Sequence, residues 1–500
     1  MKITLYYFLV GILFLAGVGL FSFFNLGILD LNRPYARTLP EKLGEQEPVV
    51  AFLNVNVVPM DSERILEDQT VIVRDGVIES IGSSDQLEVL AEALIVDGRG
   101  RYLMPGLVDM HVHVTNENEL LLFVAHGVTS VRNLWGGLNG TDHLGWRAKI
   151  EAGDMFGPTL YTSGPIMEGP PKTVPWMKVY EDPESAADAV NEQIDQGYDF
   201  IKVYDYISLP VYEAVIETAH SRGVMVVGHT PKKVGIDRVL RGGQVTIEHI
   251  SGIIDADAGE YSVPDSDLPE YARKLADAGI YVCPTIAVYQ LYVPDEDLHL
   301  LIERPEMDLI SPGTNFMWRY FQRPGSISNV TYQGDYPARM NEMFLNTTRI
   351  LHENGVKFIL GTDTDNPYLV PGTSLLDELD HLVTAGFSPY EALETGTRTA
   401  AEAMGKSDEF GTIGAGKRAD LILLEDNPLD DIGNIQNRAG VMVRGHWLTY
   451  EQLKSMLDGL VESYQPNLVE RLWPLGLIAL SIYMIVRKVR RTPREKKDGI

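Results

Sequence analysis

The stretch MPGLVDMHVHV, residues 104–114, decides the fold and much of the chemistry. It is apolar over nearly its whole length, which is typical of a strand buried on both faces of a parallel sheet. The strand ends in His111-Val112-His113, and because side chains alternate along a strand, both imidazoles lie on the same side. The stretch therefore predicts both a core element and a candidate functional site at its end.

Short apolar segments of this kind recur along the chain. They are GVTSVRN (127–133), TLYTSG (159–164), DFIKVYD (199–205), VMVVGHT (224–230), VTIEHI (245–250), IYVCPT (280–285) and VKFILGTD (356–363). Helical stretches such as ESAADAVNEQIDQG and PVYEAVIETAHSRG separate some of them. Eight buried strands alternating with helices predict an α/β fold, a closed (β/α)₈ TIM barrel over residues 105–410. An open doubly wound sheet is the alternative.

The segments that flank the barrel have a different texture. Residues 49–104 consist of short apolar runs separated by turn residues, including an Asp75-Gly76 hairpin turn, and the same texture returns in residues 411–450. Both segments, residues 49–104 and 411–450, are predicted to form hairpin strands of small β units. Within the barrel, residues 287–355 are too long for an ordinary connection and rich in aromatic residues, which predicts an insertion that covers the barrel mouth or stabilises the fold.

Polar residues gather at the predicted strand ends, where TIM barrels carry their active sites. Six of them are His111, His113, Lys202, His229, His249 and Asp363. Each alone has an ordinary structural explanation, but buried ionisable groups are costly unless they are paired or bind a metal, so the coincidence indicates a site. Neutral imidazoles with a carboxylate suit Zn²⁺, with Mn²⁺, Fe²⁺ or Co²⁺ as alternatives.

Lys202 is the unusual member of this set, because an ammonium group would repel a metal ion. A lysine buried among apolar strand residues has a lowered pKa, and its free amine can react with CO₂ to give a carbamate anion that bridges two cations. The alternative is a salt bridge between Lys202 and a carboxylate such as Asp205.

The motifs MPGLVDMHVHV, IKVY, GHT, EH and GTD, in that order, resemble the amidohydrolase superfamily of metal-dependent hydrolases, and GTIGAGKRADLILLEDNPL resembles its C-terminal β-segment. The resemblance implies a barrel plus a small β-sandwich built from both chain ends. It implies one metal ion held by His111, His113 and Asp363, and a second held by His229 and His249, with N6-carboxylated Lys202 as the bridge. The subgroup is imidazolonepropionase-like and prolidase-like, and IKVY favours the prolidase-like side, because imidazolonepropionases lack the bridging lysine.

The predicted reaction is hydrolysis of a C–N bond in a small amide, cyclic amide or dipeptide. A metal ion lowers the pKa of bound water toward ~7, and Asp363 is the predicted catalytic acid–base that carries the proton to the leaving nitrogen. Tyr204 is a candidate oxyanion or carboxylate contact. Arg132 is a candidate contact for a substrate carboxylate, with a structural ion pair as its alternative. A lactonase or esterase on the same site, and a non-catalytic scaffold that retains the fold, are the rival functions.

The charge of the chain excludes one class of partner. Its 500 residues contain 42 Lys and Arg against 70 Asp and Glu, a net charge of −28. Nucleic-acid binders carry a basic face, so no nucleic-acid partner is expected. The single cysteine, Cys283, excludes an internal disulfide. The predicted partner is a small-molecule substrate, and the sequence predicts no oligomeric state.

Both ends of the chain contain apolar runs. Residues 3–29 carry no charged side chain, so residues 1–29 are interpreted as a transmembrane anchor, with a cleaved signal peptide as the alternative. Residues 472–486 form a second apolar run, interpreted as a transmembrane or interfacial helix, and residues 487–500 form a basic tail. The basic tail is expected to be cytoplasmic, which predicts a membrane-anchored protein with its catalytic body on the extracytoplasmic side.

Overall fold

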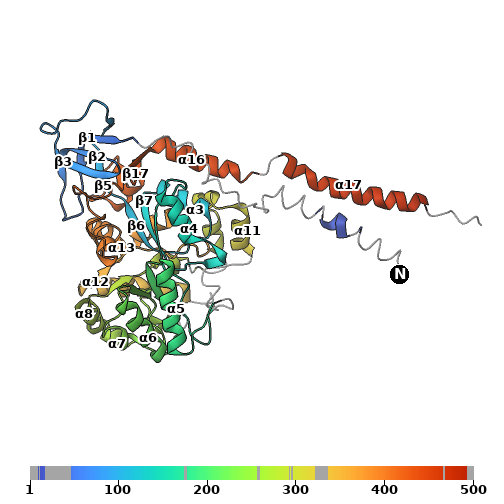
Figure 1. Ribbon diagram of the computed structural model, residues 1–500, viewed down its shortest axis with the longest axis horizontal. Coiled ribbons are helices and arrows are strands. Elements are labelled where there is room, and N and C mark those ends of the chain that lie inside the picture. The colour runs from blue at the N-terminus through green and yellow to red at the C-terminus, as the bar shows by residue number, and fades with distance from the viewer. Residues whose placement is uncertain are drawn as a thin grey trace, which may run out of the picture. The chain divides into compact units, whose positions relative to one another are not determined.

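The structure, a computed structural model, describes residues 10, 12–16, 18, 47–173, 177–255, 260–291, 293, 297–320, 336–465 and 468–491 (Figure 1). These residues fall into two compact units. The larger unit lies within residues 34–307 and 322–457, and the smaller one within residues 1–33, 308–321 and 458–500. The barrel and the β-rich segments both belong to the larger unit.

Eight parallel strands form the barrel, at the eight apolar segments of the sequence. They are β6 (Leu107–Val112), β7 (Val128–Asn133), β8 (Thr159–Thr162), β9 (Phe200–Val203), β10 (Met225–Gly228), β11 (Thr246–Glu248), β14 (Tyr281–Cys283) and β15 (Lys357–Phe358). Ladders join β6–β7–β8, β9–β10 and β11–β14–β15. Parallel bridges Ser163–Phe200, Val226–Gln244 and Val112–Thr364 connect these groups and close the ring.

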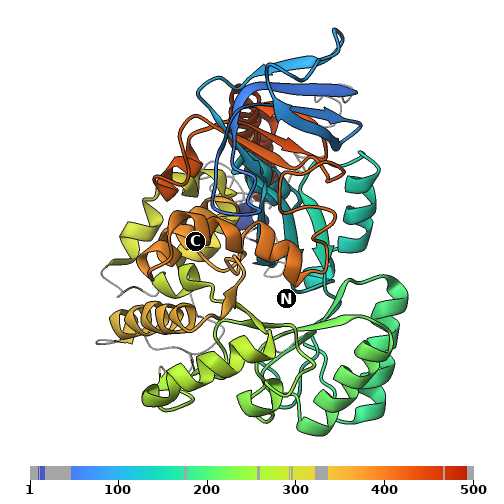
Figure 2. The same ribbon diagram turned by 90° about the vertical axis from the view of Figure 1, so that its left-hand side faces the viewer.

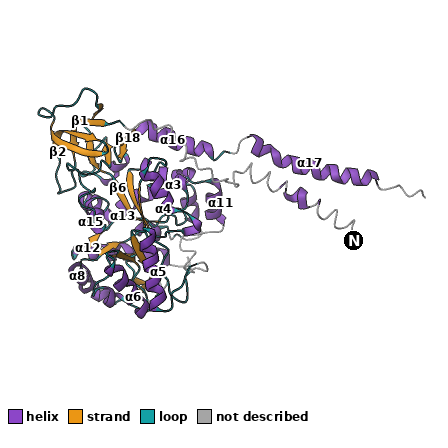
Figure 3. Ribbon diagram, viewed as in Figure 1, coloured by secondary structure: helices purple, strands orange, loops and turns teal. Residues whose placement is uncertain are grey.

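Helices follow most of the barrel strands (Figure 3). They are α3 (Glu117–Ala125), α4 (His143–Glu151), α5 (Pro183–Gln196), α6 (Leu209–Ser221), α7 (Ile236–Val239), α8 (Leu268–Ala278), α12 (Tyr336–Glu353), α13 (Thr373–Thr384), α14 (Pro389–Thr395) and α15 (Arg398–Ala403). Helix α5 shows why such segments are helical. The Asp182 side chain caps its first turn through the Ser185 amide, a proline occupies the first turn, and Gly197 ends it at φ 94°.

The connection between β14 and β15 contains helices of its own. They are α9 (Ile286–Gln290), α10 (Leu298–Ile302), a 3₁₀ helix η5 (Pro305–Leu309), α11 (Pro312–Tyr320) and α12. Within the larger unit, Tyr289 of α9 stacks on Phe344 of α12 with ring centroids 3.7 Å apart. This part of the predicted insertion therefore has an aromatic core.

The flanking β-segments form one mixed sheet, which Figure 2 shows as blue and red strands side by side. Its strands are β1 (Val49–Val57), β2 (Leu66–Arg74), β3 (Val77–Ser83), β4 (Leu94–Asp97), β5 (Tyr102–Pro105), β16 (Leu421–Leu424), β17 (Arg438–Val443) and β18 (His446–Thr449). Strand β5 pairs with β1 and β16 and so joins the two chain segments. The pairing is continuous, so strands of both chain segments belong to one composite sheet, and its division into the two layers of a sandwich stays a prediction.

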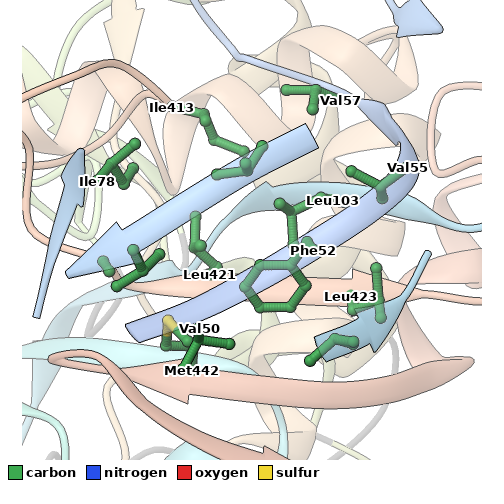
Figure 4. Packing of buried hydrophobic residues seen from close by; sticks show 14 residues of the cluster. Val50, Phe52, Val55, Val57, Ile78, Leu103, Ile413, Leu421, Leu423 and Met442 are labelled. Atoms are coloured by element: carbon green, nitrogen blue, oxygen red, sulfur yellow. The ribbon is translucent and has the colours of Figure 1, made fainter. Parts of the chain in front are cut away.

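One face of this composite sheet carries its core (Figure 4). Val50 and Phe52 of β1 lie beside Val73 and Val71 of β2, and Leu423 of β16 lies opposite Leu103 of β5. Alternate residues thus face the same apolar cluster, as the period of a strand requires. The buried Ile422 points to the other face, close to Gly127 at the start of β7.

The terminal segments correct the membrane predictions. The predicted anchor at residues 1–29 lies outside the described residues except for 10, 12–16 and 18, and residues 492–500 of the basic tail also lie outside them. The chain ends in helices α16 (Tyr450–Ser463) and α17 (Leu468–Arg491). Among the described residues, no helix is long and apolar enough to cross a membrane. The predicted transmembrane helix at residues 472–486, the membrane partner and the extracytoplasmic catalytic body are therefore wrong, whereas the anchor predicted at residues 1–29 falls largely outside the described residues.

The physical reason is length. The apolar run of α17 covers residues 472–486 between Arg471 and Arg487. At 1.5 Å per residue it spans about 22 Å, less than the ~30 Å of a bilayer core.

Candidate metal centre

The six predicted ligand residues meet at the carboxyl ends of the barrel strands. They come from β6, β9, the segments directly after β10 and β11, and the segment after β15. The Asp363 carboxylate is the common point: its Oδ1 lies 2.9 Å from His113 Nε2 and 3.2 Å from His111 Nε2, and its Oδ2 lies 3.9 Å from His249 Nε2. His229 joins through His249, with ring centroids 4.9 Å apart.

The backbone at two of these residues is strained. His249 has φ 60° and Asp363 has φ 63°, in the left-handed region that residues other than glycine rarely adopt. Such conformations cost about 1–3 kcal/mol each and gather at functional sites. The strand ends thus hold these two side chains at the centre at the expense of backbone strain.

Partners behind the rings determine which imidazole nitrogen faces the centre. His111 Nδ1 donates to Glu248 Oε2 at 2.9 Å, and His229 Nδ1 donates to Asp205 Oδ1 at 2.7 Å, because an ionised carboxylate only accepts. The Nδ1 atoms of these two rings therefore carry the hydrogens. Their Nε2 atoms present lone pairs to the centre.

His249 follows the same pattern. Thr285 Oγ1 donates its hydrogen to the Pro284 carbonyl at 2.8 Å, so it accepts from His249 Nδ1 at 2.6 Å. Burial lowers the pKa of His249 to about 3 and also lowers the pKa of His111 well below its usual value, so both rings are neutral. Neutral imidazoles with free Nε2 lone pairs are the form that binds metal ions.

The centre is consequently rich in acceptors and poor in donors. His111 Nε2 faces an Asp363 oxygen, although both atoms are acceptors, and the buried His229 Nε2 has no hydrogen-bond partner among the described residues. Burial would raise the pKa of Asp363, but the neighbouring His249 and the hydrogen bond with His113 lower it to about 2. Converging lone pairs and a carboxylate need a cation between them, so the residues fit divalent metal ions.

Lys202 lies beside this cluster. Its side chain is 1% exposed, and its Nζ is 3.3 Å from His111 Nε2. Burial lowers the pKa of Lys202 to about 8, so part of the population carries a free amine near neutral pH. Asp205, the alternative partner considered for Lys202, hydrogen-bonds to His229.

The two candidate substrate contacts lie in different surroundings. Tyr204 lies at the centre, with its ring 4.1 Å from the His229 ring. Arg132 is 1% exposed and donates from Nη2 to Glu248 Oε1 at 2.8 Å and from Nε to the Met110 carbonyl at 2.5 Å. The contacts of Arg132 fit the structural ion pair considered for it.

Sequence reasoning did not assign Glu248, Asp205 or Thr285 to the site as partners of the histidines. All three stand at strand ends or one to two residues beyond them, as the six candidates do. Their position was therefore a usable signal. Their pairing with particular rings depends on contacts between strands, which the sequence does not show.

Fold and site together define a class: a (β/α)₈ barrel with a composite β-sheet and a histidine- and aspartate-lined centre that can hold divalent metal ions. The sequence model of the Amidohydrolase family matches residues 102–448. The chain belongs to this family, whose members are hydrolases that generally use divalent metals.

Known proteins similar to the chain include members of both predicted subgroups. Imidazolonepropionase of Geobacillus thermodenitrificans is 25% identical over 406 residues, which cover 73% of this chain and 85% of the relative. The structure of bottromycin amidohydrolase superposes with a TM-score of 0.70 at 25% identity, covering 88% of this chain and 95% of the other. A putative prolidase from Bifidobacterium longum superposes with a TM-score of 0.64 at 26% identity, covering 83% and 100%. The resemblance to imidazolonepropionase-like and prolidase-like amidohydrolases is thus confirmed.

Proposed function

We propose that this protein is a binuclear metal-dependent amidohydrolase that cleaves a C–N bond in a small amide, cyclic amide or dipeptide. The observation that carries the proposal is the convergence of three imidazole rings, those of His111, His113 and His249, on the Asp363 carboxylate. His111, His113 and Asp363 would hold one ion, and His229 and His249 the second. N6-carboxylated Lys202 would bridge them. Zn²⁺ suits this set of nitrogen and oxygen ligands best.

When bound, the metal ions supply a Lewis acid for the substrate carbonyl and make water a better nucleophile. The protein's own residues supply the proton transfer. Asp363 is ionised at neutral pH because its pKa is about 2, so its carboxylate can accept the proton of the attacking water. Asn366 Nδ2 donates to Asp363 Oδ2 at 2.7 Å and orients the carboxylate. From there Asp363 passes the proton to the leaving nitrogen, which departs as an amine.

Cleavage of an amide or dipeptide bond is supported by two of the similar proteins, which are described as a bottromycin amidohydrolase and a putative prolidase. We favour a dipeptide of the Xaa-Pro type, because Lys202 is present at the predicted bridging position. Esters and lactones are easier to cleave than amides, so the same centre could also hydrolyse them. A lactonase would hydrolyse them and no amide.

The test combines metal analysis with a substrate panel on the full chain, purified after growth with Zn²⁺ and bicarbonate. Wild-type protein should hold about two metal ions per chain and hydrolyse at least one amide, cyclic amide or dipeptide. Lys202→Ala should lose about one ion, whereas the matched control Lys274→Ala, an exposed lysine in α8, should lose none.

Asp363→Asn should lower kcat/KM by about 10³–10⁴-fold, because it removes the acid–base and weakens a metal ligand. Asp380→Asn, an exposed carboxylate in α13, is its control and should leave kcat/KM unchanged. Full metal content in Lys202→Ala would contradict the bridging role. Hydrolysis of esters and lactones alone would identify a lactonase, and no bound metal with no turnover would identify a scaffold.

A further inference from the structure

An apolar cluster borders the metal centre on one side. Ile166 and Met177, 3% and 6% exposed, pack together, and the partly exposed rings of Trp135 and Tyr204 cover them. We call these four residues the apolar wall. They come from three successive barrel connections, because Trp135 follows β7, Ile166 and Met177 follow β8, and Tyr204 follows β9.

The wall runs alongside the ligands of both proposed metal ions. The Trp135 ring is 6.0 Å from the His113 ring, and the Tyr204 ring is 4.1 Å from the His229 ring. On another side of the centre, the Tyr289 ring is 6.4 Å from the His249 ring. A substrate whose scissile bond lies at the metal centre therefore has aromatic side chains within reach of its substituents.

Hydrogen bonds hold the wall in one arrangement. The buried Glu168 carboxylate accepts from the Gly169 and Tyr206 amides, both at 2.8 Å, and from Thr173 Oγ1 at 2.7 Å. These bonds join the connection after β8 to the one after β9. A side chain on Gly169 would meet the Tyr206 carbonyl oxygen at 2.2 Å, so the two connections approach as closely as glycine allows.

Backbone bonds extend this link to the wall itself. The Met167 amide donates to the Lys202 carbonyl at 2.8 Å, and the Tyr204 amide donates to the Met167 carbonyl at 3.0 Å. Ile166 and Tyr204 are thus held together by the same bonds that align β9 beside the segment carrying Ile166. A preformed surface costs a ligand less than one that must first be ordered.

We propose that the substrate carries a large apolar group, aromatic or branched, beside its scissile C–N bond, and that this group binds against the apolar wall. The inference rests on the proposed function and narrows its substrate class. Partly exposed rings beside the metal centre lose water when such a group covers them, and burial of apolar surface favours binding. A small or charged substituent gains no such contact.

The experiment compares matched dipeptides on the full-length, metal-loaded protein. Phe-Pro is paired with Ala-Pro, and Gly-Phe with Gly-Ala, because the wall can lie on either side of the scissile bond. In at least one pair, kcat/KM should favour the phenylalanine substrate by about tenfold or more, mostly through a lower KM. Equal kcat/KM values in both pairs would overturn the inference while leaving the proposed hydrolase intact.

Variants of the apolar wall test whether it causes the preference for the phenylalanine substrate. Trp135→Ala and Met177→Ala should each reduce the preference for phenylalanine to about threefold or less, and Trp135→Phe should retain most of it. Trp146→Ala, a half-buried tryptophan of α4 outside the wall, is the matched control and should keep the full preference. Two separate wall variants guard against one that does not fold. An unchanged preference in both folded wall variants would overturn the inference.

A binding measurement separates this inference from the proposed function. Calorimetry with 3-phenylpropionate and propionate, which contain no C–N bond to cleave, should show tighter binding of the phenyl compound to wild type than to Trp135→Ala. If no peptide is hydrolysed but this difference is present, the proposed function fails and the apolar wall stands. If neither compound binds more tightly to wild type, the wall fails.

Discussion

The barrel centre and the core of the composite sheet both bury most of their side chains, yet the chemistry of these side chains is opposite. The sheet core is a cluster of fourteen buried residues, all apolar, contributed by both chain segments. The barrel centre holds Lys202, Arg132 and Glu248 at 0–1% exposure beside its histidines. Apolar burial stabilises a fold, whereas burying ionisable groups costs free energy unless each is paired.

This difference teaches which property each region controls. The sheet core carries stability and touches no candidate ligand. Apolar residues in place of the buried ionisable groups of the barrel centre would give a more stable protein. The presence of these groups is expected if the reaction needs their chemistry. Substitutions in the sheet core should therefore change the free energy of unfolding, and substitutions in the barrel centre should change metal binding or the rate of hydrolysis. Variants of single residues test whether the two effects are separate.

Glu248→Ala should produce the largest effect, because Glu248 contributes both to stability and to the metal centre. It removes the ion-pair partner of Arg132 and the acceptor of His111 Nδ1. Leaving the buried guanidinium unpaired should lower the free energy of unfolding by about 3–5 kcal/mol. Loss of the His111 acceptor should lower metal affinity by about 10–100-fold. Urea unfolding and metal titration measure the two effects.

The double variant Arg132→Met with Glu248→Met separates the effect on stability from the effect on metal affinity. With no unpaired charge left behind, stability should return toward the wild-type value, because apolar replacements of buried ion pairs are often neutral or stabilising. Metal affinity should remain low, since His111 still lacks its acceptor. Equal stability of the single and double variants would show that the ion pair is not the cause.

Phe52→Ala should affect stability alone. Phe52 is fully buried in the sheet core and meets the Trp447 ring edge-on at 5.1 Å. Truncation should lower the free energy of unfolding by about 3–4 kcal/mol, while metal content and kcat per folded molecule stay at wild-type values. Val77→Ala, an exposed position on β3, is the control and should change neither. A large drop in kcat for folded Phe52→Ala would contradict the claim that the sheet core affects stability alone.

Asp205→Asn should change metal binding with little effect on stability. The amide oxygen of asparagine can still accept from His229 Nδ1, but it lacks the charge that makes this ring a better ligand. We expect a loss of about tenfold in metal affinity at the His229 position, measured by competition with a chelator. Asp255→Asn, which changes a carboxylate contact of Lys232, should leave the affinity unchanged. No change in Asp205→Asn would reject the proposed ligand role of His229.

A feature of the fold or the site could be predicted from the sequence when it depends on residues close together in the chain. The barrel strands could be predicted because each is a local apolar run, and the six candidate ligands could be predicted because they stand at strand ends. The pairing of His111 with Glu248 joins residues 137 positions apart, and the apolar wall combines three connections. Neither leaves a local pattern. The failed membrane prediction has another cause, since the run at 472–486 is apolar but, at fifteen residues, shorter than a bilayer core requires.

Glu378, a buried carboxylate of α13 that is not a candidate ligand, gives the last expected effect, on the pH dependence of stability. Burial raises the pKa of Glu378 to about 8, outweighing the hydrogen bonds that its carboxylate accepts from the Ile286 and Ala287 amides. The folded state therefore keeps a proton that the unfolded chain releases near its ordinary value of 4.5. The stability supplied by Glu378 is fully present below that pH and is lost as pH rises toward about 8.

Glu378→Gln binds no proton, so its melting temperature should rise relative to wild type between pH 5 and pH 9. Melting curves of both proteins across this range measure the difference. Parallel curves would mean that Glu378 ionises in the folded protein at its ordinary pKa, and that its two backbone donors balance burial. A widening gap would show that the barrel interior carries a pH-dependent cost. The sheet core cannot carry that cost, because its cluster contains no carboxylate, imidazole or amine.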